Sequence, residues 1–190
     1  MKKARILSKQ ELRRVMDHIA TRPHAERNRA LICTMRYAGL RACEAASLKV
    51  KDVVDAQGEI KNEIYLTPQQ TKGKSGRSVL INSKLSKELS GYLAGMQIIS
   101  PEQSLFPTQK NPMRGFTANG ISGFFCRLFA DVGLEGCSSH GFRREFITTL
   151  ANNSVAIHAI MSLSGHRRLS SVQEYLSVTD EQKRRAVELL

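Results

Sequence analysis

Apolar residues recur at intervals of three and four along most of this chain, a pattern typical of helices that bury one face. The first predicted helix follows Ser8, which forms a capping box with Glu11, and continues through Leu12, Val15 and Ile19. Glycine or asparagine stands after several later segments and predicts where those helices end. The further predicted helices are residues 23–38, 42–48, 83–97, 117–131, 139–152, 154–163, 170–176 and 180–189.

Two short segments interrupt this helical pattern. Residues 59–66 (EIKNEIYL) and 77–81 (RSVLI) are predicted to be strands, joined by the loop PQQTKGKSG. Ser83 is predicted to cap the next helix, and residues 101–116 carry three prolines and little periodicity, which predicts a loop. The pattern therefore predicts a mainly α fold with a small antiparallel β-sheet, an α+β arrangement.

The length and composition fit one folded domain. The chain has 190 residues, 41% of them hydrophobic, which is enough to bury a core. We find no internal repeat, low-complexity tract or interdomain linker. No run of 18 apolar residues occurs, and no apolar stretch follows the N-terminal lysines, so we predict neither a membrane span nor a signal peptide. We therefore expect a cytoplasmic protein.

The charge balance points to a polyanionic partner. Lysine and arginine number 29 against 17 acidic residues, giving a formal charge of +12 that is spread along the chain. This distribution predicts a folded basic surface more than a disordered arm. The four cysteines lack metal-ligand or disulfide spacing, and we expect Cys33 and Cys126 to be small core residues. We predict no metal site and no cofactor.

The segment HGFRR, residues 140–144, is the first candidate for chemistry. His140 and Arg143 are three residues apart and would share a helix face, with Phe142 and Ile147 on the buried side. Taken alone, two polar residues on a solvated face explain this pattern better than catalysis does.

A second candidate lies further along the chain. LSGHRR, residues 163–168, ends a helix at Gly165 and presents His166 just beyond it, and Tyr175 follows nine residues later. A lone tyrosine at such a position is usually a half-buried packing residue.

Two further features lie in the first half of the chain. Arg41 opens a helix, where backbone N–H groups favour an anion, and Glu44 one turn later could orient Arg41 or simply favour the helix start. The loop TKGKSGR, residues 71–77, is by itself best explained as a soluble hairpin turn.

Together, the order and spacing of these features resemble the catalytic domain of the tyrosine recombinase or phage integrase family, over nearly the whole chain. The resemblance is strongest where HxxR is followed after 23 residues by His166 and after nine more by Tyr175. It implies that Arg41 and Arg143 clamp the scissile phosphate, that His140 and His166 are the family histidines, and that Tyr175 is the nucleophile. Lys72 matches the hairpin lysine that protonates the leaving group, with Lys74 as the alternative.

This chain departs from the family pattern at two places. Arg144 stands where the family commonly has a histidine, and LSGH replaces the usual LLGH. Arg144 could contact phosphate or support its helix. Neither departure removes a catalytic group.

The resemblance also implies a reaction and partners. We expect a site-specific recombinase that cleaves and rejoins double-stranded DNA through a 3′-phosphotyrosyl intermediate, without metal or ATP. We expect self-association on DNA as a tetrameric synapse, an accessory DNA-binding protein and association with the nucleoid. The alternatives are a catalytically idle DNA-binding regulator and an enzyme like the type IB topoisomerases.

The resemblance covers only the catalytic domain of most family members. In this respect the chain is similar to the short recombinases that invert fimbrial promoter segments and lack the N-terminal core-binding domain. We therefore expect residues 1–190 to form a single catalytic domain, with residues 177–190 as a tail that is exchanged between protomers.

Overall fold

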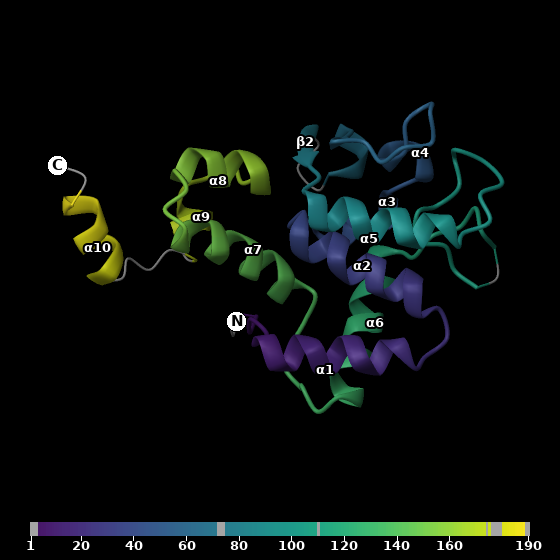
Figure 1. The fold of residues 1–190 in the computed structure, drawn as a ribbon, viewed down its shortest axis with the longest axis horizontal. Helices are drawn as coiled ribbons and strands as arrows, with labels where there is room; N and C mark the ends of the chain where they lie inside the picture. The colour runs from purple at the N-terminus through teal and green to yellow at the C-terminus, as the bar shows by residue number, and fades with distance from the viewer. Residues whose placement is uncertain (1–3, 72–74, 110, 174, 176–179, 189–190) are drawn as a thin grey trace.

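The computed structural model describes residues 4–71, 75–109, 111–173, 175 and 180–188. Within them helices predominate and one pair of strands forms an antiparallel sheet, which confirms the predicted fold class (Figure 1). None of the described helices is long and apolar enough to cross a lipid bilayer. The helices are α1 (Lys9–Ala20), α2 (Ala25–Tyr37), α3 (Ala42–Ser47), α4 (Val50–Val53), α5 (Ser83–Ala94), α6 (Ala118–Asp131), α7 (His140–Asn152), α8 (Ile157–Ser164), α9 (Ser170–Gln173) and α10 (Asp180–Val187).

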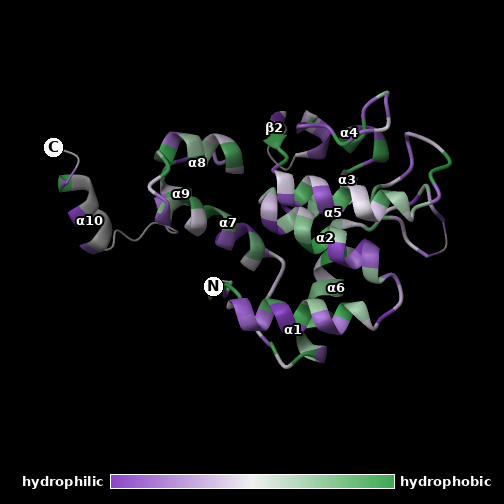
Figure 2. Ribbon diagram, in the orientation of Figure 1, coloured by the Kyte–Doolittle hydropathy of each residue, from purple (hydrophilic) through white to green (hydrophobic). Residues whose placement is uncertain are grey.

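Helix α1 begins where the sequence predicted. The Ser8 hydroxyl accepts the Glu11 N–H, and the Glu11 carboxylate accepts the Ser8 N–H, which satisfies two free donors of the first turn. Val15 and Ile19 are buried on one face, and Figure 2 shows hydrophilic and hydrophobic positions side by side along this helix. The apolar face of α1 packs on α2.

Helix α2 runs through the centre of the fold. It contacts α1, α5 and α7, and seven of its residues are buried. An ion pair of 2.6 Å between Arg36 Nη2 and Glu145 Oε1 also joins it to α7. The helix is followed by Gly39, whose φ of +60° suits glycine and turns the chain toward α3. This turn brings Arg41 to the N-cap position of α3.

The sheet is a hairpin of β1 (Glu63–Leu66) and β2 (Arg77–Leu80), with Leu66 opposite Arg77. Alternate residues are buried, as expected for strands with one face on the core. At the base of the hairpin loop, the buried Thr71 hydroxyl donates to the Ser75 carbonyl oxygen and accepts the Ser75 N–H. Thr71 therefore holds the two ends of the loop together.

The apolar core is divided into two clusters that meet along α7. The larger cluster contains the fully buried rings of Phe106, Phe125, Phe129 and Phe142. The smaller cluster is built on Ile147, Ile160 and Val172, with Tyr175 among the half-buried residues packed against it. Figure 1 shows α7 leading from the main body to α8 and α9, with α10 beyond them. Helix α7 thus contributes to both clusters.

Several predicted boundaries differ from the structure. The first strand begins at Glu63, because Ile60 instead bridges Val54 next to helix α4, which the sequence analysis missed. The cap of α5 is Asn82 and not Ser83, since the Asn82 side chain accepts the Leu85 N–H.

Two later expectations are also corrected. Helix α8 starts at Ile157 and not at residue 154, because Ser154 has a φ of +58° and closes the end of α7. The expectation that Cys126 is a core residue is wrong. It is exposed on α6, whose buried face is defined by Ile121, Phe125 and Leu128.

Candidate active site

Arg41 and Glu44 form the first pair of the site. The Glu44 side chain is 0% exposed, and its Oε1 accepts a hydrogen bond of 2.9 Å from Arg41 Nη1. Its Oε2 accepts the Arg41 N–H at 2.8 Å. Burial acts to raise the pKa of Glu44, but the charge of Arg77 and the contacts with Arg41 outweigh burial and lower the pKa below its usual value. Glu44 is therefore a carboxylate that orients Arg41.

Arg143 enters the site from α7 and is buried. Its Nη1 donates to the Gly39 carbonyl oxygen at 2.7 Å, and its Nη2 donates to the Ser164 carbonyl oxygen. Burial, with the charge of Arg41, lowers the pKa of Arg143 to about 9, so the guanidinium remains charged at neutral pH. Two backbone carbonyls thus hold a cation inside the protein, beside Arg41.

His166 follows the C-cap of α8, Gly165, whose φ is +67°. Its Nδ1 lies 2.7 Å from Ser164 Oγ, and its Nε2 lies 3.4 Å from Arg143 Nη2. The Ser164 hydroxyl donates to the Ile160 carbonyl oxygen at 2.6 Å, so it accepts from His166 Nδ1. In the neutral imidazole, Nε2 is then the acceptor and faces Arg143.

The surroundings keep the His166 imidazole neutral. Burial, followed by the charges of Arg143, Arg41 and Arg77, lowers the pKa of His166 to about 4. An anion placed among these arginines would offset their charge. The site is therefore set up to hold a negative group next to His166.

Tyr175 lies on the same side of the molecule as His166. The two ring centroids are 6.3 Å apart, and the Tyr175 ring packs against the smaller core cluster. The Tyr175 N–H donates to the Val172 carbonyl oxygen just beyond α9. The turn after α9 therefore positions the phenol ring near the histidine.

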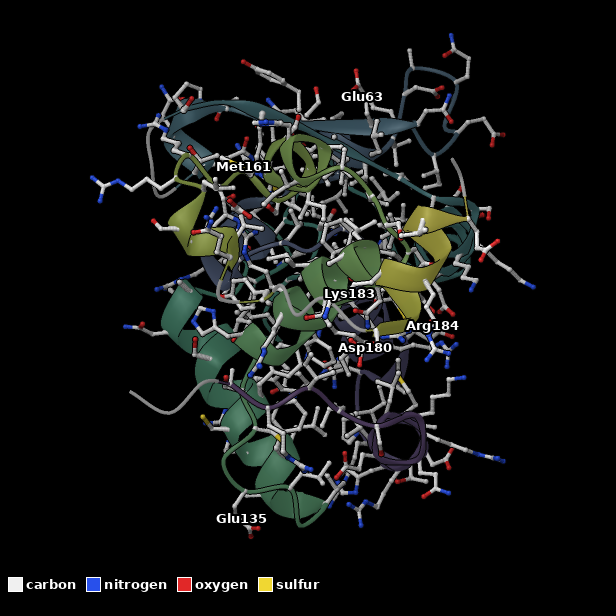
Figure 3. All side chains as sticks on the ribbon, turned by 90° about the vertical axis from the view of Figure 1, so that its left-hand side faces the viewer. Glu63, Glu135, Met161, Asp180, Lys183 and Arg184 are labelled. Atoms are coloured by element: carbon white, nitrogen blue, oxygen red, sulfur yellow. The ribbon has the colours of Figure 1, made fainter. Side chains whose placement is uncertain are left out.

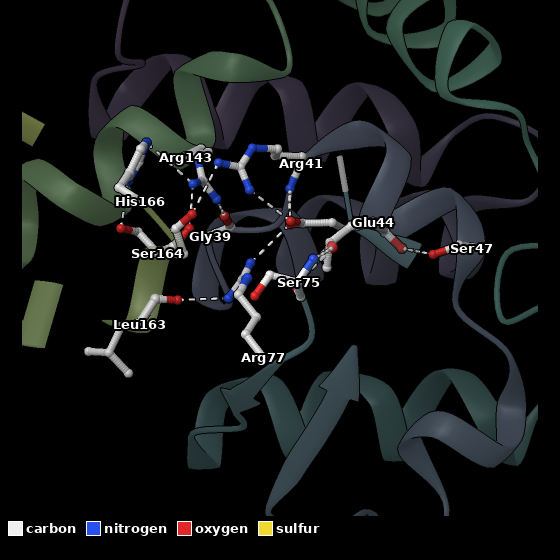
Figure 4. Close-up of polar contacts among 12 residues, drawn as sticks. Gly39, Arg41, Glu44, Ser47, Ser75, Arg77, Arg143, Leu163, Ser164 and His166 are labelled. Atoms are coloured by element: carbon white, nitrogen blue, oxygen red, sulfur yellow. Dashed lines mark hydrogen bonds and ion pairs between the residues drawn. The ribbon is translucent and has the colours of Figure 1, made fainter. Parts of the chain in front are cut away.

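A hollow of about 920 Å³ lies in front of this group. Arg41, Arg77, Arg167 and Arg168 line it, and Glu44 is the acidic residue among the described residues of its wall. Figure 4 shows Arg41 and Glu44 from the start of α3 converging with Arg77, Arg143 and His166 from three other parts of the chain. Such a hollow is suited to an anion, because guanidiniums bind phosphate oxygens with charge-assisted hydrogen bonds.

Other predicted site residues have different outcomes. Lys72 and Lys74 lie outside the described residues. His140 is exposed at the first position of α7, and no hydrogen bond joins it to another described residue of the site. Arg144 does not face the hollow, since its Nη1 donates to the Ala4 carbonyl oxygen at 2.8 Å. Of the two roles considered for Arg144, support of the fold fits these contacts.

The sequence analysis missed the contribution of Arg77, which it treated only as a strand opener. The side chain is 11% exposed, and Nη2 donates to Glu44 Oε2 at 2.9 Å. The sequence did contain a signal. A long basic side chain stands at the first position of a short, partly buried strand, directly after a glycine-rich loop.

This fold brings two arginines, a histidine and a nearby tyrosine together in the arrangement of one protein family. The chain belongs to the Phage integrase family, whose model matches residues 5–182.

Curated relatives are tyrosine recombinases. The chain is 28% identical over 162 residues to tyrosine recombinase XerC of Lactobacillus delbrueckii subsp. bulgaricus, covering 83% of this chain and 52% of the relative. It is 30% identical over 182 residues to tyrosine recombinase XerA of Thermococcus kodakarensis, covering 96% of this chain and 61% of the relative. The chain therefore spans between about half and three fifths of these relatives.

Solved structures share the fold. The crystal structure of XerA recombinase superposes with a TM-score of 0.74 at 23% identity, covering 100% of this chain and 66% of that one. The post-cleavage complex of XerH site-specific recombinase bound to palindromic difH substrate has a TM-score of 0.69 at 23% identity, covering 96% and 51%.

Proposed function

We propose that this chain is the catalytic domain of a site-specific DNA recombinase that cleaves and rejoins strands through a 3′-phosphotyrosyl bond. The observation that carries this proposal is that Arg41 and His166 line one basic hollow, with Arg143 Nη2 3.4 Å from His166 Nε2 and with the Tyr175 ring beside His166. Family membership and the tyrosine recombinases among its relatives support the same reaction.

In the proposed reaction, Arg41 and Arg143 bind the non-bridging oxygens of the scissile phosphate. Attack on the phosphorus builds further negative charge there, and two preorganised guanidiniums stabilise that charge. The Tyr175 hydroxyl loses its proton and forms a new bond to phosphorus, while the bond to the 5′ oxygen breaks. Lys72, with Lys74 as the alternative, gives a proton to that leaving oxygen.

Rejoining is the reverse of this step. A 5′-hydroxyl from another strand attacks the phosphotyrosine and releases Tyr175, so the energy of the broken bond is kept and no ATP is needed. His166, once protonated beside the anion, donates a hydrogen bond from Nε2 to the bound phosphate, and His140 with the arginines favours ionisation of Tyr175.

Covalent trapping on a nicked suicide duplex tests the reaction. Tyr175→Phe removes the attacking oxygen and keeps the ring, so we expect normal DNA affinity but no adduct that survives denaturant. Tyr65→Phe is the matched control, because Tyr65 is a 61% exposed tyrosine on the hairpin, and it should form the adduct at the unsubstituted rate. A denaturant-resistant adduct in the Tyr175→Phe protein would refute the proposed nucleophile.

A substrate with a 5′-bridging phosphorothiolate separates the two lysines, because its thiolate leaves without a proton. If Lys72 is the acid, cleavage by Lys72→Ala is restored on this substrate. Restoration of Lys74→Ala alone would assign the role to Lys74.

We further propose that the protein acts on double-stranded DNA as a tetrameric synapse in the cytoplasm, at the nucleoid, with an accessory DNA-binding protein. The XerH structure bound to difH substrate supports DNA as the partner. Residues 177–190 are proposed to be the tail that passes between protomers. Figure 3 shows α10 of this tail with Asp180, Lys183 and Arg184.

A further inference from the structure

Arg77 opens strand β2 directly after the hairpin loop, and its side chain reaches into the site. Its Nη1 donates to the Leu163 carbonyl oxygen at 2.8 Å, while Nη2 donates to Glu44 Oε2 at 2.9 Å (Figure 4). The aliphatic part lies against Gly165, since a Cβ on that glycine would come within 2.6 Å of Arg77 Cδ. Arg77 therefore connects the start of α3 to the end of α8.

The first consequence concerns Arg41. Glu44 Oε1 binds Arg41 Nη1, whereas Oε2 is already occupied by Arg77 and by the Arg41 backbone N–H. Because Oε2 is occupied, Glu44 cannot form a bidentate pair with the Arg41 guanidinium. The other nitrogen, Arg41 Nη2, makes only a 3.4 Å contact with the Gly165 carbonyl oxygen among the described residues. Donors of Arg41 thus remain available for an anion in the hollow.

The second consequence concerns the turn that presents His166. The last carbonyls of a helix lack partners within the helix. Here three consecutive carbonyls at the end of α8 accept from three arginines: Leu163 from Arg77, Ser164 from Arg143 and Gly165 from Arg41. Arg77 is the member of this set that reaches the turn from the hairpin. Its loss would free the first of the three carbonyls.

We infer that Arg77 is a positioning residue for the proposed strand cleavage. By binding one oxygen of Glu44 and the Leu163 carbonyl, it keeps Arg41 available for the phosphate and fixes the turn that carries His166. This inference rests on the proposed function and goes beyond the residues that touch the phosphate.

The test compares Arg77→Met with Arg29→Met. Each change removes one positive charge and two hydrogen bonds to other groups, because Arg29 binds both oxygens of Glu88 at 2.6 Å, outside the hollow. Single-turnover cleavage of the nicked suicide duplex is measured at saturating protein, with thermal unfolding as the check on folding. We expect Arg77→Met to cleave at least about tenfold more slowly, with DNA affinity changed by less than about threefold. Arg29→Met should cleave like the unsubstituted chain.

A second variant and a second substrate make the test decisive. Arg77→Lys retains the charge, but a single ammonium cannot bind Glu44 and the Leu163 carbonyl oxygen with the geometry of the planar guanidinium. We therefore expect an intermediate rate. A lysine variant at the full rate overturns the inference even if the methionine variant fails to fold. On the 5′-bridging phosphorothiolate substrate, the defect of Arg77→Met should persist, because Arg41 and His166 act on the non-bridging oxygens.

The remaining outcomes separate this inference from the reaction itself. If the thiolate substrate restores Arg77→Met, Arg77 acts through the hairpin lysine and the inference is wrong. If Arg77→Met is folded and cleaves at the full rate, the inference alone fails. If the unsubstituted chain forms no adduct, the proposed function fails and the inference fails with it.

Discussion

Glu44 shows how much of this site depends on one buried side chain. It is a fully buried carboxylate that binds Arg41 and Arg77. The sequence could predict Arg41, Arg143, His166 and Tyr175 as a set, because their spacing follows a family pattern. It could not predict that Glu44 is shared by two arginines, because Arg77 is brought to it by the fold across 33 positions of sequence.

His166 makes the site sensitive to pH. Its pKa falls to about 4 in the folded protein, mainly through burial and then through Arg143, whereas an unfolded histidine titrates near 6.5. Between these values the unfolded chain binds more protons than the folded chain. The contribution of His166 to the free energy of unfolding is therefore fully present above pH 6.5 and declines as the pH falls toward 4. We expect urea unfolding to show a smaller loss of stability between pH 7 and pH 5 in His166→Gln. An equal loss in both proteins would contradict this.

The same imidazole should report an anion in the hollow. Orthovanadate or phosphate among the arginines would offset their charge and accept a hydrogen bond from Nε2–H of the protonated ring, which raises the pKa of His166. Titration of the imidazole by NMR, with and without the anion, measures the change.

At the scale of elements, amphipathic helices were predicted well and their junctions less so. The capping box of α1 is local, and the structure confirms it. The starts of α5 and α8, by contrast, depend on which of two neighbouring residues caps the helix and on a positive φ at Ser154. Cys126 was misjudged because one step along a helix turns a side chain by about 100° away from the buried face.

The turn between α2 and α3 requires glycine at position 39, and this requirement can be tested. Gly39 has a φ of +60°, and a Cβ there would lie 2.5 Å from Phe146 Cδ1. Gly58 has a φ of +88° but no atom within 4 Å of such a Cβ. Gly58→Ala should therefore cost about 1–2 kcal/mol of backbone strain, and Gly39→Ala should cost more. Chemical denaturation measures both, and equal losses would exclude the ring contact as a cause.

Gly39→Ala should also slow cleavage, because the Gly39 carbonyl oxygen binds Arg143. Gly58→Ala should leave the rate of adduct formation unchanged, since Gly58 lies outside the hollow.

Helix α10 gives a prediction about assembly. It covers Asp180–Val187, and Val187 is 67% exposed. So short a helix is marginal without a docking surface. We expect that deletion of residues 180–190 leaves single-site DNA binding nearly intact but abolishes higher-order complexes and strand exchange. Gel-shift and recombination assays on paired sites measure the two effects, and full recombination by the shortened protein would show that the tail serves only local packing.

At the scale of the whole molecule, the net charge of +12 should govern encounters with the proposed DNA partner. Much of the affinity should come from counterion release, so binding should weaken steeply with salt. Arg167 and Arg168 line the hollow and are exposed, so changing both to glutamine should lower the log–log salt slope by about two. The same change at the exposed Arg13 and Arg14 on α1 should leave the slope nearly unchanged. Equal effects of the two pairs would mean that binding is not directed to the hollow.

The two core clusters have a consequence for heat tolerance. Tyr175 packs on the smaller cluster, in which three described residues are fully buried, while the larger cluster holds most of the aromatic rings. Units with little buried apolar surface open locally at a lower free-energy cost than the global transition. Warming should therefore release α8 and α9 before the rest of the domain melts. Over that interval the protein would have stopped cutting DNA and would bind it less tightly, because Arg167 and Arg168 lie between these two helices. Loss of catalysis on heating would therefore be reversible and would precede loss of the fold.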